Sequence, residues 1–289
     1  MRITRLFVML LVLLLTASLV AQDNAAKEKY NAGIKARQAK NLAEAEKQFM
    51  AATAAFPQYK EAWNELGTVR YELKKLAPAE EALQKAVSVD PSYQAAYKNL
   101  GIVQLKAKKC AQAEASFKKS LELKPGDPES QKSLGQIYLE QKLYDKAIEV
   151  FQAYNTANPT DAKSHYFLGK AYKEKGDPTN AEKEFQAATK ADPKFAEAFL
   201  SYANLLYDTK KYPGAVSAYK SAVAADRGMV TAYYGLALSY TKAEQYTEAL
   251  QAYKDFVKVA EGKPAWKTQV QQVKTDYIPQ LEQSLQSGQ

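Results

Sequence analysis

Among the side chains that carry nucleophilic or metal-ligand chemistry, cysteine and histidine each occur once in this 289-residue chain, as Cys110 and His165. One thiol cannot form a disulfide within the chain, and one thiol with one imidazole cannot complete a zinc site. Neither has the neighbouring base and orienting group that activate a nucleophile. The sequence also contains no phosphate-binding loop, nucleophile elbow or zinc-protease signature. It therefore predicts a protein that is not an enzyme and that needs no cofactor or metal.

The elements that position the other side chains are set by a repeat. Alanine recurs every 34 residues from Ala45 to Ala249 without insertion or deletion. Four positions after each alanine stands a large apolar residue: Phe49, Leu83, Phe117, Phe151, Phe185, Tyr219 and Tyr253. Twelve positions before each stands a very small one: Gly33, Gly67, Gly101, Gly135, Gly169, Ala203 and Ala237. Residues 26–263 thus divide into seven units: 26–59, 60–93, 94–127, 128–161, 162–195, 196–229 and 230–263.

Each unit is predicted to form two helices joined by a turn. In the second unit, Trp63, Leu66 and Arg70 are spaced three and four residues apart and share one helix face. Ala79 and Leu83 begin the apolar stripe of a second helix. Glycine inside a helix costs about 1 kcal/mol relative to alanine, so the column of small residues indicates that the two helices cross closely there. Proline disfavours helix in the residue before it and closes five units, at Pro57, Pro91, Pro125, Pro159 and Pro193.

On these residues the chain resembles a tetratricopeptide-repeat (TPR) protein, whose 34-residue pattern is W-x2-L-G-x2-Y…A-x3-F…P. The fourth unit matches with Leu134-Gly135-x2-Tyr138, Ala147-x3-Phe151 and Pro159. The first unit departs at Lys29, where an aromatic residue is usual, and the last two units lack the closing proline. The resemblance implies an all-α fold, a right-handed α-solenoid of seven helix-turn-helix units over residues 22–263.

The two ends of the chain are distinct from the repeats. Arg2 and Arg5 precede an uncharged apolar run over residues 6–20, which is typical of a secretory signal peptide cleaved after Ala21. The alternative is an uncleaved membrane anchor formed by residues 6–20. Residues 264–289 are predicted to form a C-terminal capping helix and tail, because a stack of repeats leaves its last apolar face open. Pro279 is expected to kink or end this helix.

Composition limits the classes of partner that the chain is expected to bind. The net charge of +8 would suit nucleic acid or an anionic surface, but an exported protein is not expected to meet nucleic acid. Cys110 falls in a column of leucines and tyrosines, and His165 falls in the column of Trp63 and Phe199. Both are therefore predicted to be packing residues, with a reactive thiol as the alternative for Cys110.

The resemblance also implies where a partner would bind. In TPR proteins the first helix of each unit lines a concave groove, and positions two, five, nine, twelve and thirteen of the unit point inward. The candidate binding residues at these positions are Tyr71, Lys98, Lys132, Tyr166, Lys170, Asn204, Tyr207 and Tyr234. Tyrosine offers a large contact area and a hydroxyl, which suits recognition. The alternative is that these tyrosines only cover neighbouring helices.

The sequence therefore predicts a non-enzymatic scaffold or adaptor of the cell envelope that binds a protein or peptide segment in its groove. Its expected location is the periplasm. The lysine and asparagine set with which some TPR proteins clamp a C-terminal carboxylate is incomplete, since Ile102 follows Lys98 where asparagine is required. The alternative function is carbohydrate binding in envelope polysaccharide export or wall assembly, because tyrosines stack on sugar rings. Contact with a membrane is expected only if the signal segment is uncleaved, and the oligomeric state is left open.

Overall fold

The computed structural model describes residues 23–287, and every regular element in that range is a helix. The predicted all-α fold is thus confirmed. The signal peptide predicted for residues 1–21, and the alternative anchor at 6–20, lie outside the described residues. Within residues 23–287, no helix is both long enough and apolar enough to cross a membrane.

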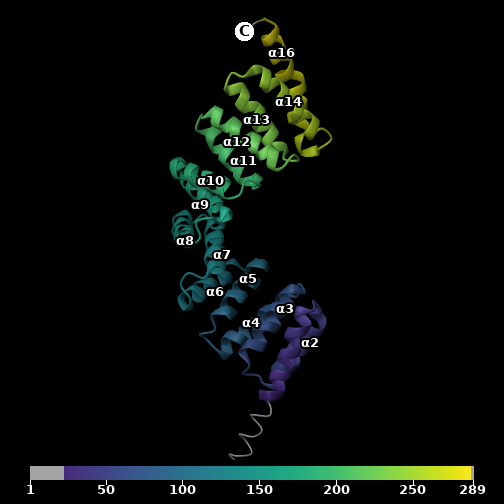
Figure 1. Ribbon diagram of the computed structural model, residues 1–289, viewed down its shortest axis with the longest axis vertical. Coiled ribbons are helices and arrows are strands. Elements are labelled where there is room, and N and C mark those ends of the chain that lie inside the picture. The colour runs from purple at the N-terminus through teal and green to yellow at the C-terminus, as the bar shows by residue number, and fades with distance from the viewer. Residues whose placement is uncertain (1–22, 288–289) are drawn as a thin grey trace, which may run out of the picture. The chain divides into compact units, whose positions relative to one another are not determined.

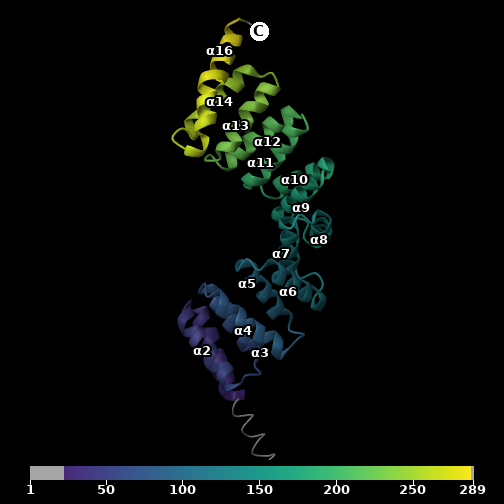
Figure 2. The same cartoon turned by 180° about the vertical axis from the view of Figure 1, so that it is seen from behind.

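The chain forms two compact units, residues 1–137 and 138–289, which we call the N-terminal and C-terminal units. The N-terminal unit holds a helix described from residue 23 to 38, then α2 (Leu42–Ala55), α3 (Lys60–Glu72), α4 (Leu76–Val89), α5 (Gln94–Lys106), α6 (Cys110–Leu123) and most of α7 (Pro128–Glu140). The C-terminal unit holds α8 (Tyr144–Ala157), α9 (Ala162–Lys175), α10 (Pro178–Ala191), α11 (Ala196–Asp208), α12 (Tyr212–Ala225), α13 (Val230–Lys242) and α14 (Tyr246–Ala260). In the N-terminal unit successive helices from α2 to α6 pack against one another, and in the C-terminal unit successive helices from α8 to α14 do the same (Figures 1 and 2).

The second helix of every pair begins at the same place in the repeat: Leu42, Leu76, Cys110, Tyr144, Pro178, Tyr212 and Tyr246. The column of small residues marks the crossing, as the sequence predicts. A Cβ on Gly169 would lie 2.7 Å from the ring of Phe185, and Gly33 and Gly101 face Phe49 and Phe117 equally closely. Glycine is therefore needed there so that a buried ring can lie against the backbone of the first helix.

The turn between the two helices of a pair uses one left-handed residue at a fixed position. It is Lys40, Lys74, Lys108, Lys142, Lys210 or Glu244, with φ between 59° and 62°, and Gly176 in the remaining pair, with φ 88°. Glycine adopts this conformation at no steric cost, whereas a side chain carries some strain. The recurrence shows that one turn geometry is shared by all seven pairs.

Successive pairs are also held in register by repeated ion pairs between second helices and the next turn. Lys75 Nζ lies 2.6 Å from Glu46 Oε2, Lys109 Nζ lies 2.7 Å from Glu80 Oε2, and Lys211 Nζ lies 2.7 Å from Glu182 Oε2. Each pair joins residues 29 positions apart. The carboxylates are less exposed than the lysines, so each lysine covers a partly desolvated acid.

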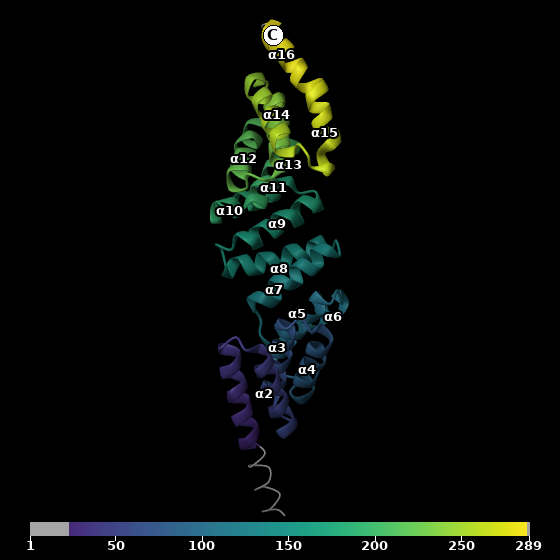
Figure 3. The same ribbon diagram turned by 90° about the vertical axis from the view of Figure 1, so that its right-hand side faces the viewer.

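The C-terminal segment packs on the last pair, as predicted for a capping helix. It comprises a 3-10 turn (Pro264–Trp266), α15 (Lys267–Gln272), a π-helical turn named η2 (Val273–Tyr277) and α16 (Ile278–Ser287). α15, η2 and α16 contact α14, and Trp266 of the 3-10 turn packs edge-on against Phe256 of α14. Figure 3 shows α15 and α16 running alongside α14. Val273 is fully buried, and Val270 and Leu281 are nearly so.

Pro279 does not end this helix. The helix continues through it to Ser287, and the π-helical turn lies immediately before it, with the Ile278 N–H bonded to the Val273 carbonyl. Proline lacks an N–H and its ring pushes on the carbonyl four residues earlier, so the wider turn relieves the clash. The consequence is a changed register that brings the ring of Tyr277 to 5.2 Å from that of Tyr253.

Candidate binding face on the first helices

All eight candidate binding residues lie on first helices of the pairs. In the N-terminal unit these are Tyr71 on α3, Lys98 on α5 and Lys132 on α7, and in the C-terminal unit Tyr166 and Lys170 on α9, Asn204 and Tyr207 on α11, and Tyr234 on α13. Lys170 is exposed and the other seven are half-buried. The two groups belong to different compact units and are described separately.

On α9, Tyr166 and Lys170 lie one helical turn apart and interact. The Lys170 ammonium lies 5.6 Å from the centre of the Tyr166 ring, in cation–π range. The other side of that ring packs on Phe195 and Phe185, with centroids 5.1 and 6.1 Å away. Core packing therefore fixes the ring, while Lys170 and the open edge of the ring remain accessible.

On α11, the two candidate residues have different roles. Tyr207 is half-buried and its ring packs edge-on against Tyr212, with centroids 5.6 Å apart. Burial raises the pKa of Tyr207, and Tyr212 and Asp208 contribute to the rise. Asn204 instead accepts a 2.5 Å hydrogen bond from the hydroxyl of Tyr219, a core residue that is 4% exposed. Asn204 thus supports the core as well as facing the candidate surface.

On α13, Tyr234 is tied to the C-terminal segment. Its ring lies 5.0 Å from Phe256 and 6.1 Å from Trp266. Burial raises its pKa to about 12, with further contributions from Tyr277, which also hydrogen-bonds it, and from Tyr207. Tyr234 therefore covers neighbouring helices, as the packing alternative proposes, and its hydroxyl is already used.

The hydroxyl groups separate binding candidates from core tyrosines. Tyr219 donates to Asn204, and Tyr154 donates to Asp161 over 2.8 Å. By contrast, the hydroxyls of Tyr71, Tyr166 and Tyr207 form no hydrogen bond with any residue between 23 and 287. None of the three is a buried unsatisfied atom, so each hydroxyl can bond to water or to a ligand.

In the N-terminal unit, Tyr71 borders a row of polar side chains on α3 and α5. The Asn99 amide nitrogen donates to Asn64 Oδ1 over 2.9 Å, and the Thr68 hydroxyl donates to the Asn64 carbonyl over 2.9 Å. Lys98 has no ion-pair partner among the described residues, and Lys132 lies half-buried on α7. The structure thus groups Tyr71 with Thr68 and Asn99, which the sequence analysis did not select.

Charges on the first helices neutralise one another between successive pairs. Arg37 binds Glu65 with an Nη1–Oε2 distance of 2.7 Å and also binds Glu72 through Nε at 3.1 Å. Lys173 Nζ lies 3.5 Å from Asp208 Oδ2 in the equivalent arrangement of the C-terminal unit. The first helices of each unit therefore carry charges of both signs that are paired with one another.

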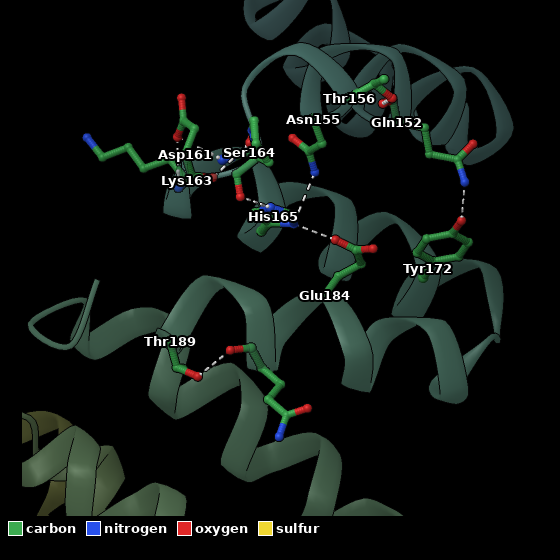
Figure 4. Close-up of polar contacts among 12 residues, drawn as sticks. Gln152, Asn155, Thr156, Asp161, Lys163, Ser164, His165, Tyr172, Glu184 and Thr189 are labelled. Atoms are coloured by element: carbon green, nitrogen blue, oxygen red, sulfur yellow. Dashed lines mark hydrogen bonds and ion pairs between the residues drawn. The ribbon is translucent and has the colours of Figure 1, made fainter. Parts of the chain in front are cut away.

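His165 occupies the predicted packing position and does more than pack. Trp63, four positions into its unit, donates its indole N–H to the Pro57 carbonyl over 2.9 Å, and His165 Nε2 lies 3.0 Å from the equivalent Pro159 carbonyl. Its other nitrogen, Nδ1, lies 2.6 Å from Glu184 Oε2 (Figure 4). Both nitrogens face acceptors, and the hydrogen bond with Glu184 is the main cause that raises the pKa of His165. The imidazolium is thus the form that this site favours.

Figure 4 also shows Asn155 of α8 approaching the same ring nitrogen as Glu184, with its amide nitrogen 3.2 Å from Nδ1. The carbonyl oxygen of Asn155 is buried without a hydrogen bond among the described residues. Rotating the amide would turn that oxygen toward Nδ1, where it would share the single N–H that is donated to Glu184. Cys110 is half-buried at the start of α6, and no three acidic, histidine or cysteine residues within 23–287 are placed to hold a metal ion.

Three contributors to the candidate face were missed by the sequence analysis. Tyr277 was not among the candidate binding residues, and the π-helical turn that moves it toward Tyr234 has no local sequence signal beyond Pro279. Thr68 stands at position nine of its unit, an inward-pointing position, but was not selected, and Asn99 stands at position six of the next unit, which was not marked as inward-pointing. Leu83 did carry a signal, because it is the one aliphatic residue in a column that is otherwise aromatic.

The helix pairs, the glycine crossings and the shared turn define a repeat, and sequence profiles identify it. Residues 31–198 match the TPR profile of the C-terminal domain of cilia and flagella-associated protein 70, and residues 203–264 match a tetratricopeptide-repeat profile. The chain belongs to the tetratricopeptide-repeat family. Among curated proteins, none matches this TPR protein significantly.

Solved structures share the TPR fold at low sequence identity. The C-terminal part of a TPR repeat-containing protein from Cytophaga hutchinsonii is 17% identical, covers 82% of this chain and 97% of its own, and gives a TM-score of 0.69. YrrB, described as a TPR protein with an unusual peptide-binding site, is 21% identical. The match covers 64% of this chain and 95% of YrrB, with a TM-score of 0.57. PilF of Pseudomonas aeruginosa is 19% identical. The match covers 72% of this chain and 95% of PilF, with a TM-score of 0.59. At these identities the likeness concerns the fold alone.

Proposed function

We propose that this TPR protein is a non-enzymatic scaffold of the cell envelope that holds a segment of a partner protein against its first helices. The observation that carries the proposal is the set of tyrosines with unused hydroxyls, Tyr71, Tyr166 and Tyr207, on the helices that bear binding residues in TPR proteins. Their rings are fixed by packing, so little side-chain entropy is lost on binding. That YrrB is described as having a peptide-binding site is consistent with a peptide ligand.

The envelope location rests on the N-terminal sequence. Two arginines, an uncharged apolar run and the small residue Ala21 before Gln22 are typical of a secretory signal peptide. We propose export to the periplasm, with the mature protein free of the membrane.

The mixed charge of the face favours contacts by aromatic groups and hydrogen bonds over charge steering. Arg37 and Lys173 are already paired with acids of the next helix pair. Because these cations are already neutralised, they attract an acidic partner only weakly. We therefore propose that the affinity for the partner depends weakly on salt concentration.

Replacing Tyr207 by alanine should lower partner binding at least tenfold while changing the free energy of unfolding by less than about 1 kcal/mol, because the ring is only half-buried. The measurement is co-purification of the crosslinked mature chain from the envelope of its host, paired with urea denaturation. Tyr246→Ala, which removes a half-buried tyrosine from second helix α14, is the matched control and should retain the partner.

Two results would contradict the proposal. One is equal recovery of partner by wild type and Tyr207→Ala. The other is binding of the mature chain to envelope polysaccharide with no protein recovered, which would favour the carbohydrate-binding alternative.

A further inference from the structure

The N-terminal unit contains a pocket where the repeat lacks a ring. The core column holds phenylalanine or tyrosine in six pairs and Leu83 in one. A pocket of about 180 Å³ lies at Leu83, and its floor is completed by Ile102 and Val103 of α5. A leucine fills less space than a benzene ring, so the side chain at this position leaves part of the usual volume empty.

The surrounding backbone still has the geometry that accommodates a ring. Gly67 is retained opposite Leu83, just as Gly33 is opposite Phe49 and Gly101 opposite Phe117. The helices therefore cross as they do in pairs that hold a phenylalanine. For comparison, an apolar cavity of about 150 Å³ is large enough to bind benzene.

The rim of the pocket is polar and presents acceptors. Thr68, Tyr71, Glu72 and Asn99 surround the opening on α3 and α5, and no basic residue lines it. The Asn99 amide nitrogen donates to Asn64 Oδ1 over 2.9 Å and to the Thr68 hydroxyl over 3.4 Å, and the Thr68 hydroxyl donates to the main-chain carbonyl of Asn64 over 2.9 Å. The carbonyl oxygen of Asn99 remains to accept from a ligand, whereas Oε1 of Glu72 already accepts from Arg37. The oxygens of the rim complement N–H donors and disfavour an acid.

We propose that this pocket binds a phenylalanine or tyrosine side chain from an extended partner segment whose backbone N–H groups donate to Asn99. This inference rests on the proposed function, since it names the residue type that the scaffold reads in its partner. The ring would lie beside Leu83, which is itself fully buried and fills the contact with Gly67. Tyr71, with its free hydroxyl, lies at the mouth and would contact the flanking residues.

The test uses N-acetyl-phenylalanine methylamide as the probe and the mature chain with labelled methyl groups. We expect ring-current shifts in the NMR signals of Leu83, Ile102 and Val103 that saturate at millimolar concentration, with no comparable shift at Val216 of the C-terminal unit. N-acetyl-aspartate methylamide should bind at least tenfold more weakly. Shifts spread evenly over both units, or equal binding of the two probes, would overturn the inference.

Leu83→Phe is the decisive variant, because it supplies the missing ring from within and should abolish the probe shifts without loss of stability. Leu143→Phe makes the same change at an exposed position and should bind the probe like wild type. If Leu83→Phe does not fold, Ile102→Phe closes the pocket from the half-buried α5 side and should have the same effect. Probe shifts that persist at Ile102 or Val103 in a folded Leu83→Phe chain would overturn the inference.

Failure here is separable from failure of the proposed function. If the chain recovers a partner in a Tyr207-dependent manner but does not bind the aromatic probe, only the inference about the pocket is wrong. If the pocket binds the probe but the chain recovers no partner in any condition, only the proposed scaffold function is wrong.

Discussion

Replacing Gly235 by alanine is expected to destabilise the C-terminal unit by about 2–4 kcal/mol. The new Cβ would lie 2.4 Å from two ring carbons of Tyr219 and 2.7 Å from its hydroxyl oxygen. That ring cannot swing away at low cost, because Tyr219 is 4% exposed and its hydroxyl is bonded to Asn204. Relief of the clash therefore requires the ring to shift, the hydrogen bond to break, or α12 and α13 to separate.

The measurement is urea denaturation of the mature chain, with Gly214→Ala as the matched control. A Cβ on Gly214 would meet only the end of Leu206, at 3.3 Å, near the exposed start of α12. That control should be neutral or stabilise by up to about 1 kcal/mol, since alanine favours helix. A loss of stability for Gly235→Ala no greater than for Gly214→Ala would show that the ring does not lie against α13.

Breaking the His165–Glu184 pair should cost about 1–3 kcal/mol at pH 6, the second-largest effect that we expect. Both side chains are about 15% exposed, so Glu184→Gln leaves an imidazolium that is largely out of water without its carboxylate. Asp161 is the other acid that favours the charged ring, and it contributes less than Glu184. The measurement is the free energy of unfolding of wild type and Glu184→Gln between pH 5.5 and 8.5.

The sign of the pH dependence follows from the raised pKa of His165 in the folded chain. Stability from the charged ring is complete below the unfolded pKa of about 6.5, and it is lost as the pH rises through the higher folded pKa. Wild type should therefore lose stability above pH 6.5, and Glu184→Gln should lose less. The chain has a single histidine, so no second imidazole contributes to this slope.

The repeat itself supplies a control for this prediction. Trp63 stands in the position of His165, and Ala82 stands in the position of Glu184. The double variant His165→Trp with Glu184→Ala recreates that pair and should keep the hydrogen bond to Pro159 while removing the pH dependence. A wild-type slope that survives in this double variant would assign it to other groups.

The sequence predicted the fold because packing at the helix crossing repeats without a slip. Ala147 and Gly135 recur in every pair as small residues, and the closing prolines mark where second helices stop. Such columns report close contacts that one 34-residue unit cannot make alone, so their period identifies the architecture. The C-terminal segment was predicted to cap the stack and to kink or end at Pro279. It continues to Ser287, because a π-helical turn before the proline can absorb a residue that an α-helix cannot.

The contacts that the sequence did not predict depend on where individual rings point. Ala203 replaces glycine in the small column, and the ring of Tyr219 instead meets Gly235 of the next pair, two positions before the expected column. The ion pair between His165 and Glu184 could not be predicted from the repeat, because the other residues in the Glu184 column are uncharged. Of the candidate site, Tyr71, Tyr166 and Tyr207 keep free hydroxyls, whereas Asn204 and Tyr234 are partly used by the fold.

The most direct test of the scaffold function is photocrosslinking in the host from a benzophenone amino acid placed at single positions. We predict that substitutions at Tyr71 and Tyr207 on first helices crosslink to one and the same partner protein, whereas one at exposed Gln251 on second helix α14 does not. Crosslinks from Gln251 and none from Tyr71 or Tyr207 would place the partner on the opposite helices and contradict the binding face described above.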